Sequence, residues 1–406
     1  MTAAPRHRRT FYLVGAADWA LDFHVLIVAA LLVVERTGSG AALFAVAASN
    51  WLAETIFEVP TGYVADRYGR TLSTAASFAL RGIGFLVVAA AHSPLQFVIG
   101  WVVVGLGSTM LSGALEAWAV DHEREVGGKV DALLLRAQRA QSVAMLLAIG
   151  AAVAVGGISY AGPFVVAGVA GLVLAPVVAI AMGPDPGLAQ RAEARTTSGL
   201  RVIPKVLSHR DYRPLFLLGA GLTFAIAIPG VQWAPAVEEV YPTLALVPLG
   251  AVRAVAPALR AGTNWFVERG VNRFGRRMAF LSLLLVSAAL LGTVARVGGL
   301  GLIIGFAFYS ALSGIATVLI GARLNEVITT PEWRATILSL YSATIGLVTG
   351  VGLLVVGAVV GEPGDRHGVW LVSAGVLAAL GVAAGLRPRV LDGPEPAAEP
   401  AEVRTA

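Results

Sequence analysis

The sequence predicts an all-α membrane protein whose twelve transmembrane helices form two six-helix bundles related by a pseudo-two-fold axis. Three observations support this prediction. Apolar runs of about 20 residues, the length that crosses a bilayer as a helix, recur along the whole chain. Only 14% of the 406 residues are charged, against about 25% in soluble domains, so most of the surface is expected to face lipid. A charged loop motif also occurs twice, once in each half.

The twelve apolar segments define the expected domain organisation. They lie at 10–34, 41–62, 72–91, 95–119, 134–159, 162–182, 211–237, 241–264, 278–296, 300–325, 333–360 and 368–387. Residues 1–183 are then the first bundle, 184–210 a polar cytoplasmic linker rich in Pro, Gly, Arg and Ser, and 211–388 the second bundle. Residues 389–406 have the composition of a disordered cytoplasmic tail.

The distribution of basic residues predicts the orientation of the chain in the cell membrane, plasma or inner. With the N-terminus in the cytoplasm, twelve spans return the C-terminus there. Most of the 30 arginines and lysines then lie in cytoplasmic loops, tails or span ends. The residues that fall on the other side are Arg36, Arg296 and Arg366. The opposite orientation would reverse this asymmetry.

The duplicated motif follows the second apolar segment of each half. Residues 66–71 read D-R-Y-G-R-T, and residues 272–277, 206 positions later, read N-R-F-G-R-R. A charged turn at the end of a span is a candidate gate at the cytoplasmic surface. Its predicted members are Gly62, Asp66, Arg67, Gly69 and Arg70 in the first half, and Asn272, Arg273, Gly275 and Arg276 in the second. Two parallel six-helix halves are one way to build a transporter with its substrate site at their interface.

Twelve spans, a central linker and a twice-used D/N-R-x-G-R loop resemble the major facilitator superfamily over residues 10–388. Within it, the chain is most similar to bacterial drug–proton antiporters, although their fifth-helix glycine motif is not kept at its spacing. The resemblance implies a monomer. It also implies that Asp66 latches the two halves together on the cytoplasmic side.

The expected partner of Asp66 is the start of the eleventh segment. Thr330 can cap a helix whose first residue is Pro331, and such an N-terminus carries about half a positive charge. Because Asn272 replaces the aspartate in the second copy, the mirror latch is predicted to be weaker. Further gate candidates, chosen for their charge at cytoplasmic span ends, are Glu116, Asp121, Arg139 and Arg334.

The densest acidic group within the membrane lies on the first two spans: Asp18, Asp22, Glu54 and Glu58. Each pair is four residues apart and shares a helix face. A charge at mid-bilayer costs about 2.5–3.5 kcal/mol on insertion scales, so each needs a partner or a function. Asp22, Glu54 and Glu58 are candidates for proton coupling, with Arg81 as the counter-ion of Glu54 or Asp22. The alternative is that Asp18 and Glu58 only bridge helices and that Arg81 makes a structural ion pair.

The internal repeat pairs an acidic residue of the first half with a basic residue at the equivalent position of the second half. Its 206-residue offset maps Glu54 onto Arg260 and Glu58 onto Asn264. An ion pair between Glu54 and Arg260 across the central cavity would favour a closed state. Protonation of the glutamate would release it.

Aromatic and amide residues on the expected cavity-lining spans are candidates for substrate contact, together with Arg260. The set is Asn50, Trp51, Gln232, Arg260, Tyr309 and Tyr341. An aromatic, acid-bearing cavity predicts an amphipathic or cationic organic substrate. Ser342, Gly346 and Gly350 are spaced by four, which predicts close helix packing. Trp118 and Trp233, near span ends, are predicted to be interfacial anchors.

The sequence argues against an enzyme, an ATP-driven pump and a receptor, so the predicted function is a secondary active transporter. The six histidines are scattered, cysteine is absent, and no metal-ligand spacing or nucleophile motif occurs, so neither an enzyme nor a cofactor is expected. No P-loop indicates an ATP-driven pump, and a receptor or sensor would not explain the repeat. The expected partners are a small molecule, protons and the lipid bilayer, without nucleic acid. Export by proton antiport is the first prediction, and uptake by proton symport is the alternative.

Overall fold

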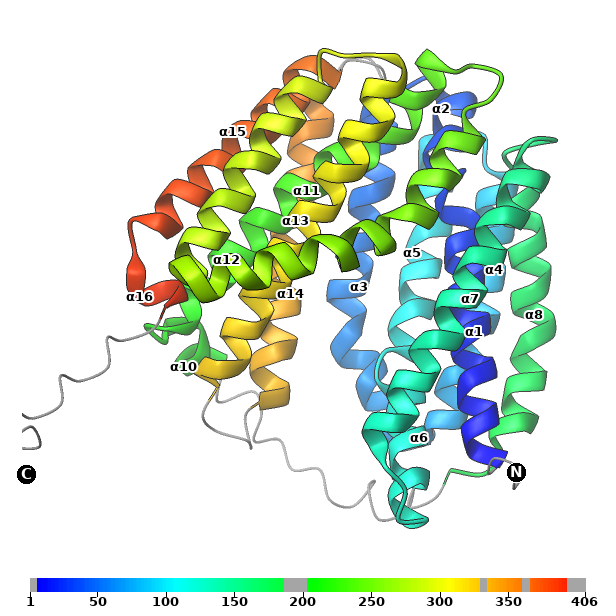
Figure 1. Cartoon of the computed structure of the whole chain (residues 1–406). Helices are drawn as coiled ribbons and strands as arrows, with labels where there is room; N and C mark the ends of the chain where they lie inside the picture. Colours follow the sequence, from blue (N-terminus) through cyan, green and yellow to red (C-terminus); the bar gives the residue numbers. More distant parts are fainter. Residues whose placement is uncertain (1–5, 186–202, 329–333, 360–365, 393–406) are drawn as a thin grey trace, which may run out of the picture.

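The computed structural model describes residues 6–185, 203–328, 334–359 and 366–392, which are helical without any strand (Figure 1). The first bundle contains α1 (Arg6–Leu26), α2 (Ala29–Thr37), α3 (Gly40–Tyr68), α4 (Arg70–Ala90), α5 (Pro94–Leu111), α6 (Ala114–Glu125), α7 (Val130–Gly156) and α8 (Gly162–Met182). The second contains α10 (Ile203–Ser208), α11 (Tyr212–Val240), α12 (Leu246–Val294), α13 (Gly299–Val327), α14 (Arg334–Val359), α15 (Arg366–Gly385) and α16 (Pro388–Leu391). The predicted linker 184–210 thus includes α10, and the predicted tail includes most of α16.

Within the described residues, eleven helical stretches are long and apolar enough to cross a membrane. The pair α1 and α2 counts as one stretch, as does the pair α5 and α6. Element α12 covers 49 residues but consists of two helices joined by a kink at Gly275. The stretch Val267–Val294, which contains the kink, is one of the eleven, whereas the predicted eighth span at 241–264 is not. Twelve spans therefore remain a prediction, while the all-α membrane fold is confirmed.

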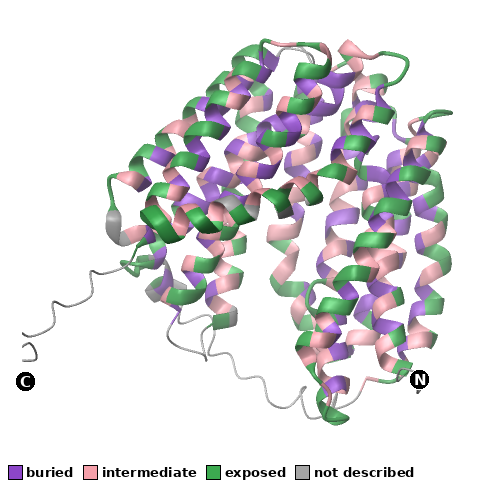
Figure 2. Cartoon of the chain, in the orientation of Figure 1, coloured by how far each residue is buried: buried purple, intermediate pink, exposed green. Residues whose placement is uncertain are grey.

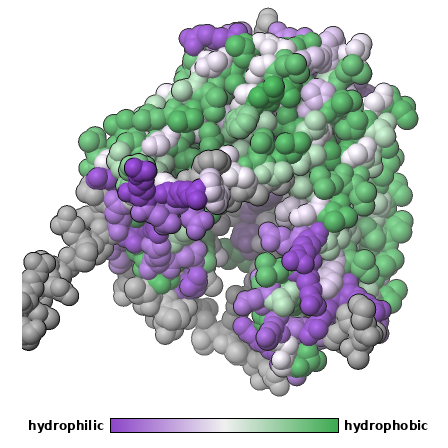
Figure 3. Space-filling model, in the orientation of Figure 1, coloured by the Kyte–Doolittle hydropathy of each residue, from purple (hydrophilic) through white to green (hydrophobic). Residues whose placement is uncertain are grey.

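The outward faces of both bundles are apolar. Figure 2 shows exposed residues along the periphery and buried ones where helices meet, and Figure 3 shows that much of the exposed surface is hydrophobic. The exposed side chains include Leu147, Ile180 and Val359. Contiguous apolar surface of this kind is unfavourable in water and suits lipid. The chain is a multi-pass membrane protein.

The duplicated motif forms the same turn in both halves. Gly69, between α3 and α4, has φ 106° and ψ 143°, and Gly275, inside α12, has φ 82° and ψ 158°. The Arg70 backbone N–H donates to Asp185 Oδ2 at 2.7 Å, and the Arg277 N–H donates to Asp392 Oδ1 at 3.0 Å. Each aspartate follows the last long helix of its half. The repeat therefore extends to tertiary contacts, and we call the end of the molecule that holds both turns the turn end.

Gly69→Ala is expected to lower the free energy of unfolding by about 1–3 kcal/mol, because a φ of 106° is rarely adopted by residues with a Cβ. Gly375→Ala is the matched control, since Gly375 lies within helix α15 with open space where its Cβ would be. Thermal unfolding in detergent, followed by tryptophan fluorescence, should give a lower Tm for the first variant only. Equal Tm values for Gly69→Ala and the native chain would contradict this account of the turn.

The bundles contact each other from the middle of the molecule to the end opposite the turns, which we call the far end. Helices α3 and α14 pack through glycine: a Cβ on Gly346 would lie 2.0 Å from Thr55 Oγ1, and one on Gly350 would lie 2.6 Å from Leu52 Cγ. Helices α7 and α12 meet similarly, where a Cβ on Gly250 would clash with Val153. The close packing predicted from the spacing of Gly346 and Gly350 is confirmed.

The predicted interfacial role of two tryptophans is wrong. Trp118 and Trp233 are almost fully buried in the protein interior. The Trp118 ring contacts His122, with centroids 4.4 Å apart, and Trp233 stacks on Phe306 at 4.4 Å with 5° between the planes. Neighbouring rings, rather than lipid headgroups, surround both side chains.

Candidate functional site

Arg81 on α4 lies between two carboxylates of α1. Its Nη1 pairs with Asp18 Oδ1 and its Nη2 with Asp22 Oδ1. The Arg81 side chain is 1% exposed, whereas that of Asp22 is 51% exposed. Gly107 of α5 provides room for the arginine, since a Cβ there would lie 2.6 Å from Arg81 Cγ. The predicted counter-ion of Asp22 is thus present, and Asp18 is its second partner.

Glu54 on α3 has a different environment. Its Oε1 accepts a hydrogen bond from Asn50 Nδ2 at 3.0 Å, one turn earlier. No arginine or lysine of the described residues lies within 4.0 Å of it, so the predicted ion pairs with Arg81 and Arg260 are not formed in this conformation. Glu58 accepts from Ser112 Oγ at 3.0 Å. Glu54 is therefore a half-buried carboxylate without a counter-ion.

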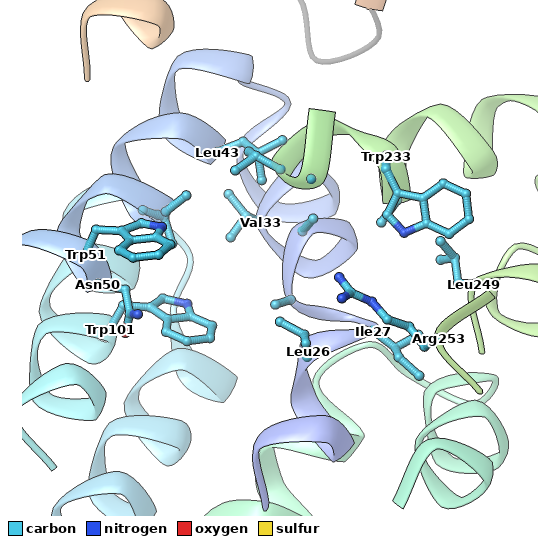
Figure 4. Close-up of a pocket in the computed structure, with 17 residues that line it drawn as sticks. Leu26, Ile27, Val33, Leu43, Asn50, Trp51, Trp101, Trp233, Leu249 and Arg253 are labelled. Atoms are coloured by element: carbon cyan, nitrogen blue, oxygen red, sulfur yellow. The ribbon is translucent and has the colours of Figure 1, made fainter. Parts of the chain in front are cut away.

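A largely apolar cavity of about 190 Å³ lies between the bundles (Figure 4). Its wall comes from α1, α2, α3 and α5 on one side and from α11 and α12 on the other. Trp51, Trp101 and Trp233 provide aromatic rings, and Asn50 and Arg253 provide polar groups. Asn50 and Trp51 were predicted substrate contacts, whereas Arg253 was not. Asn50 also connects this cavity to Glu54.

The other predicted substrate residues lie elsewhere in the second bundle. Gln232 and Tyr309 are buried within it. Tyr341 packs against Gly219, where a Cβ would meet its hydroxyl at 2.3 Å, and Arg260 packs against Gly314, where a Cβ would lie 2.6 Å from Nη2. None of the four lines the cavity described above. Their contact with substrate stays a prediction.

Charged groups at the turn end form equivalent ion pairs in the two halves. Arg70 pairs with Asp121 at 2.5 Å, and Arg276 pairs with Glu326 at 2.5 Å. Glu326 Oε2 also forms an ion pair with Arg323 Nη1 at 3.2 Å. Each pair anchors the residue that follows a glycine turn to another helix of the same bundle. The cluster thus stabilises the ends of the bundles individually.

The remaining gate candidates have local contacts or exposed positions. Arg67 Nη1 donates to Tyr63 OH at 2.5 Å, Arg273 lies 5.2 Å from the Phe274 ring, and Arg334 Nη2 donates to Asn325 Oδ1 at 2.6 Å. Nothing lies within 4 Å of a Cβ placed on Gly62. Glu116, Arg139 and Asn272 are exposed, as are the three arginines just named. Their roles in gating stay predictions.

The predicted latch joins Asp66 to the start of the eleventh span. Asp66 is half-buried at the end of α3. Thr330 and Pro331 lie outside the described residues. Docking of the aspartate on that helix start stays a prediction.

The sequence reasoning missed a buried ionic cluster near the start of the chain. Glu123 of α6 is almost fully buried and accepts from Arg8 Nε and Nη2, both at 2.7 Å. Its Oε2 also lies 2.9 Å from His7 Nε2. The basic run at residues 6–9 was visible in the sequence, but its partner is 115 positions away. The cluster fastens the start of α1 to the end of α6.

At the far end, a hydrogen bond joins the two bundles. Tyr160, between α7 and α8, donates to Glu238 Oε1 of α11 at 2.7 Å. Beside it, a Cβ on Gly156 would contact Leu246. At the turn end the halves are separated: Figure 3 shows a recess there with hydrophilic surface on both flanks. The molecule is therefore closed at the far end and open at the turn end.

Comparison with known proteins agrees with this architecture. A family model described as Major Facilitator Superfamily matches residues 11–326, and no curated protein matches the chain. The nucleoside transporter NupG superposes with a TM-score of 0.77 at 14% identity, covering 93% of this chain and 98% of its own. A bacterial homologue of the human lysosomal transporter Spinster, inward-facing and unoccupied, gives 0.75 at 14%, covering 97% and 100%. The peptide transporter POT in complex with sulfate gives 0.72 at 14%, covering 97% and 96%.

At these identities the solved structures show the fold alone. The family match is independent of them and covers most of the chain. It agrees with two helical bundles, a duplicated glycine turn and a cavity between the halves. The chain belongs to the Major Facilitator Superfamily.

Proposed function

We propose that the protein carries a small organic solute across the cell membrane by alternating access, coupled to protons. The observation that supports this best is the asymmetry between the two ends. The halves meet through glycine packing at the middle of the molecule and through the Tyr160–Glu238 hydrogen bond at the far end, and they separate at the turn end. Rocking of one bundle against the other would expose the cavity to each side in turn.

The turn end is the cytoplasmic end in this proposal. Both glycine turns and their arginines lie there, as do the start of α1 with its basic run and the C-terminal helix α16. Basic residues accumulate on the cytoplasmic side of membrane proteins. The conformation described above is then open to the cytoplasm.

Glu54 is the proposed proton carrier. It is half-buried within the membrane, has no counter-ion within 4.0 Å among the described residues, and is bonded to a residue of the cavity wall, Asn50. Burial within the membrane without a counter-ion favours the neutral, protonated carboxyl group over the charged carboxylate. Arg81 already has two acidic partners, so the Asp18–Arg81–Asp22 cluster would position α1 against α4. Release of a proton by Glu54 would change the charge next to Asn50, a residue of the cavity wall.

We propose export by proton antiport, because the acidic groups concentrate on the first two spans. Uptake by proton symport would use the same carboxylates in the same cavity. Proteoliposomes distinguish them: imposing a pH gradient of either sign shows whether solute moves against the protons or with them. A mixture of anionic, neutral and cationic aromatic solutes avoids assuming the substrate.

Glu54→Gln is expected to abolish solute movement driven by a pH gradient, because the variant cannot exchange a proton at this site. Exchange of labelled for unlabelled solute without a gradient should continue. Glu125→Gln, a change to an exposed carboxylate at the end of α6, is the control and should keep both activities. Undiminished pH-driven transport by Glu54→Gln would refute the assignment of this residue.

A further inference from the structure

We infer that the cavity between the bundles binds a small aromatic carboxylate, and that Arg253 pairs with the carboxylate group. This inference rests on the proposed transport function and specifies its substrate class. It differs from the expectation of an amphipathic or cationic substrate, which came from aromatic and acidic residues on the cavity-lining spans.

The first argument is the missing partner of Arg253. A cation within the membrane is costly unless an anion or water compensates it. The buried arginines have such partners: Arg81 pairs with Asp18 and Asp22, and Arg366 Nη1 lies 3.2 Å from Glu239 Oε2, whereas Arg253 is half-buried. Arg253 has no hydrogen bond and no acidic group within 4.0 Å among the described residues. The described residues therefore supply no counter-charge to Arg253 in this conformation, and a ligand in the cavity can supply it.

The second argument is the position of the guanidinium. Arg253 is the single ionisable residue among those that line the cavity. Figure 4 shows its side chain reaching away from α12, toward the wall that carries Ile27 and Val33. Asp22 and Glu54 do not line this space. A ligand in the cavity would therefore meet one positive charge and no negative charge.

The third argument is the shape and chemistry of the wall. Trp51, Trp101 and Trp233 present rings, and most of the remaining lining residues are aliphatic. Aromatic ligands gain from offset or edge contacts with such rings. A volume of about 190 Å³ is below the ~300–1,000 Å³ of pockets for drug-sized molecules, so a single small ring system fits. A guanidinium binds a carboxylate through two parallel hydrogen bonds. A small aromatic carboxylate satisfies all three features.

A competing explanation is that Arg253 pairs with Asp22 or Glu54 when the protein changes conformation. In that case the charge of the ligand would not matter for binding. Three probes that differ mainly in charge separate the two explanations: phenylacetate, phenylacetamide and 2-phenylethylamine. Their affinities for the purified full-length protein in detergent can be measured by isothermal titration calorimetry at neutral pH.

Phenylacetate is expected to bind at least about tenfold more tightly than the other two probes, because it alone forms a charge-assisted pair. Arg253→Gln should remove this preference, and Arg253→Lys should retain part of it. Arg296→Gln is the matched control, since Arg296 is exposed at the end of α12 and bonds to the Gly292 carbonyl. Its affinity for phenylacetate should equal that of the native chain.

Three results would overturn the inference. They are a native chain that fails to bind phenylacetate at millimolar concentration, tighter binding of 2-phenylethylamine, and an unchanged preference for phenylacetate in Arg253→Gln. If Arg253→Gln does not fold, Arg253→Lys decides, because equal affinity in that variant would exclude the two-pronged contact. All of these are binding measurements without a gradient, so they can fail while proton-coupled flux is still observed.

Discussion

Arg81→Gln is expected to abolish transport and to destabilise the protein by about 3 kcal/mol. Removing one partner of a buried ion pair costs about 3–5 kcal/mol, because the remaining charge is left uncompensated. The lower end applies here, since the Asp22 side chain is 51% exposed and keeps part of its solvation. Arg81 itself is 1% exposed, so the glutamine would also leave two acids facing a buried neutral group.

The expected result has two readouts, Tm in detergent and solute flux in proteoliposomes. Both should fall in Arg81→Gln, and Arg81→Lys should fall between that variant and the native chain because one ammonium cannot hold both carboxylates equally. The triple variant Asp18→Asn/Asp22→Asn/Arg81→Gln should recover much of the lost Tm, because no unpaired charge remains. Arg296→Gln serves as the control for loss of a surface charge. A native Tm for Arg81→Gln would show that the cluster does not stabilise the bundle.

The double variant Gly346→Val/Gly350→Val is expected to reduce transport to background by breaking the mid-helix contact between α3 and α14, which helps to close the far side of the cavity. Side chains at these positions would enter the space of Thr55 and Leu52 on α3. Overpacking a close contact costs about 1–3 kcal/mol per site. Two such costs, about 2–6 kcal/mol, approach the ~5.5 kcal/mol that moves a two-state equilibrium from 99:1 to 1:99. The opposite conformation, in which this contact is broken, would escape the penalty.

A cysteine introduced into the cavity can report the change, because the native chain contains no cysteine. Val33→Cys lies in the cavity wall and is buried in the conformation described above. In the double-valine background it should react faster with a membrane-impermeant thiol reagent added from outside the cell. Gly375→Val is the control, since a side chain there meets open space. Unchanged labelling together with unchanged transport would rule out a role of this contact in closing the far side of the cavity.

The sequence alone determined the features that depend on local chemistry. Long apolar runs predicted the membrane helices, and a glycine in each copy of the motif predicted the paired turns, because only local length and φ are involved. Spacing by four was enough to predict the glycine face of α14, because residues four apart share one side of a helix.

Only the tertiary structure decided which faces meet. Arg253 and Arg260 share a face of α12, two turns or about 10 Å apart, yet one reaches the cavity and the other packs beside Gly314. The 206-residue offset of the repeat had instead predicted that Arg260 lies at the central cavity. Arg81 likewise pairs with Asp18 and not with Glu54. These outcomes depend on the rotation and packing of helices distant in sequence, which the residue pattern of a single helix does not contain.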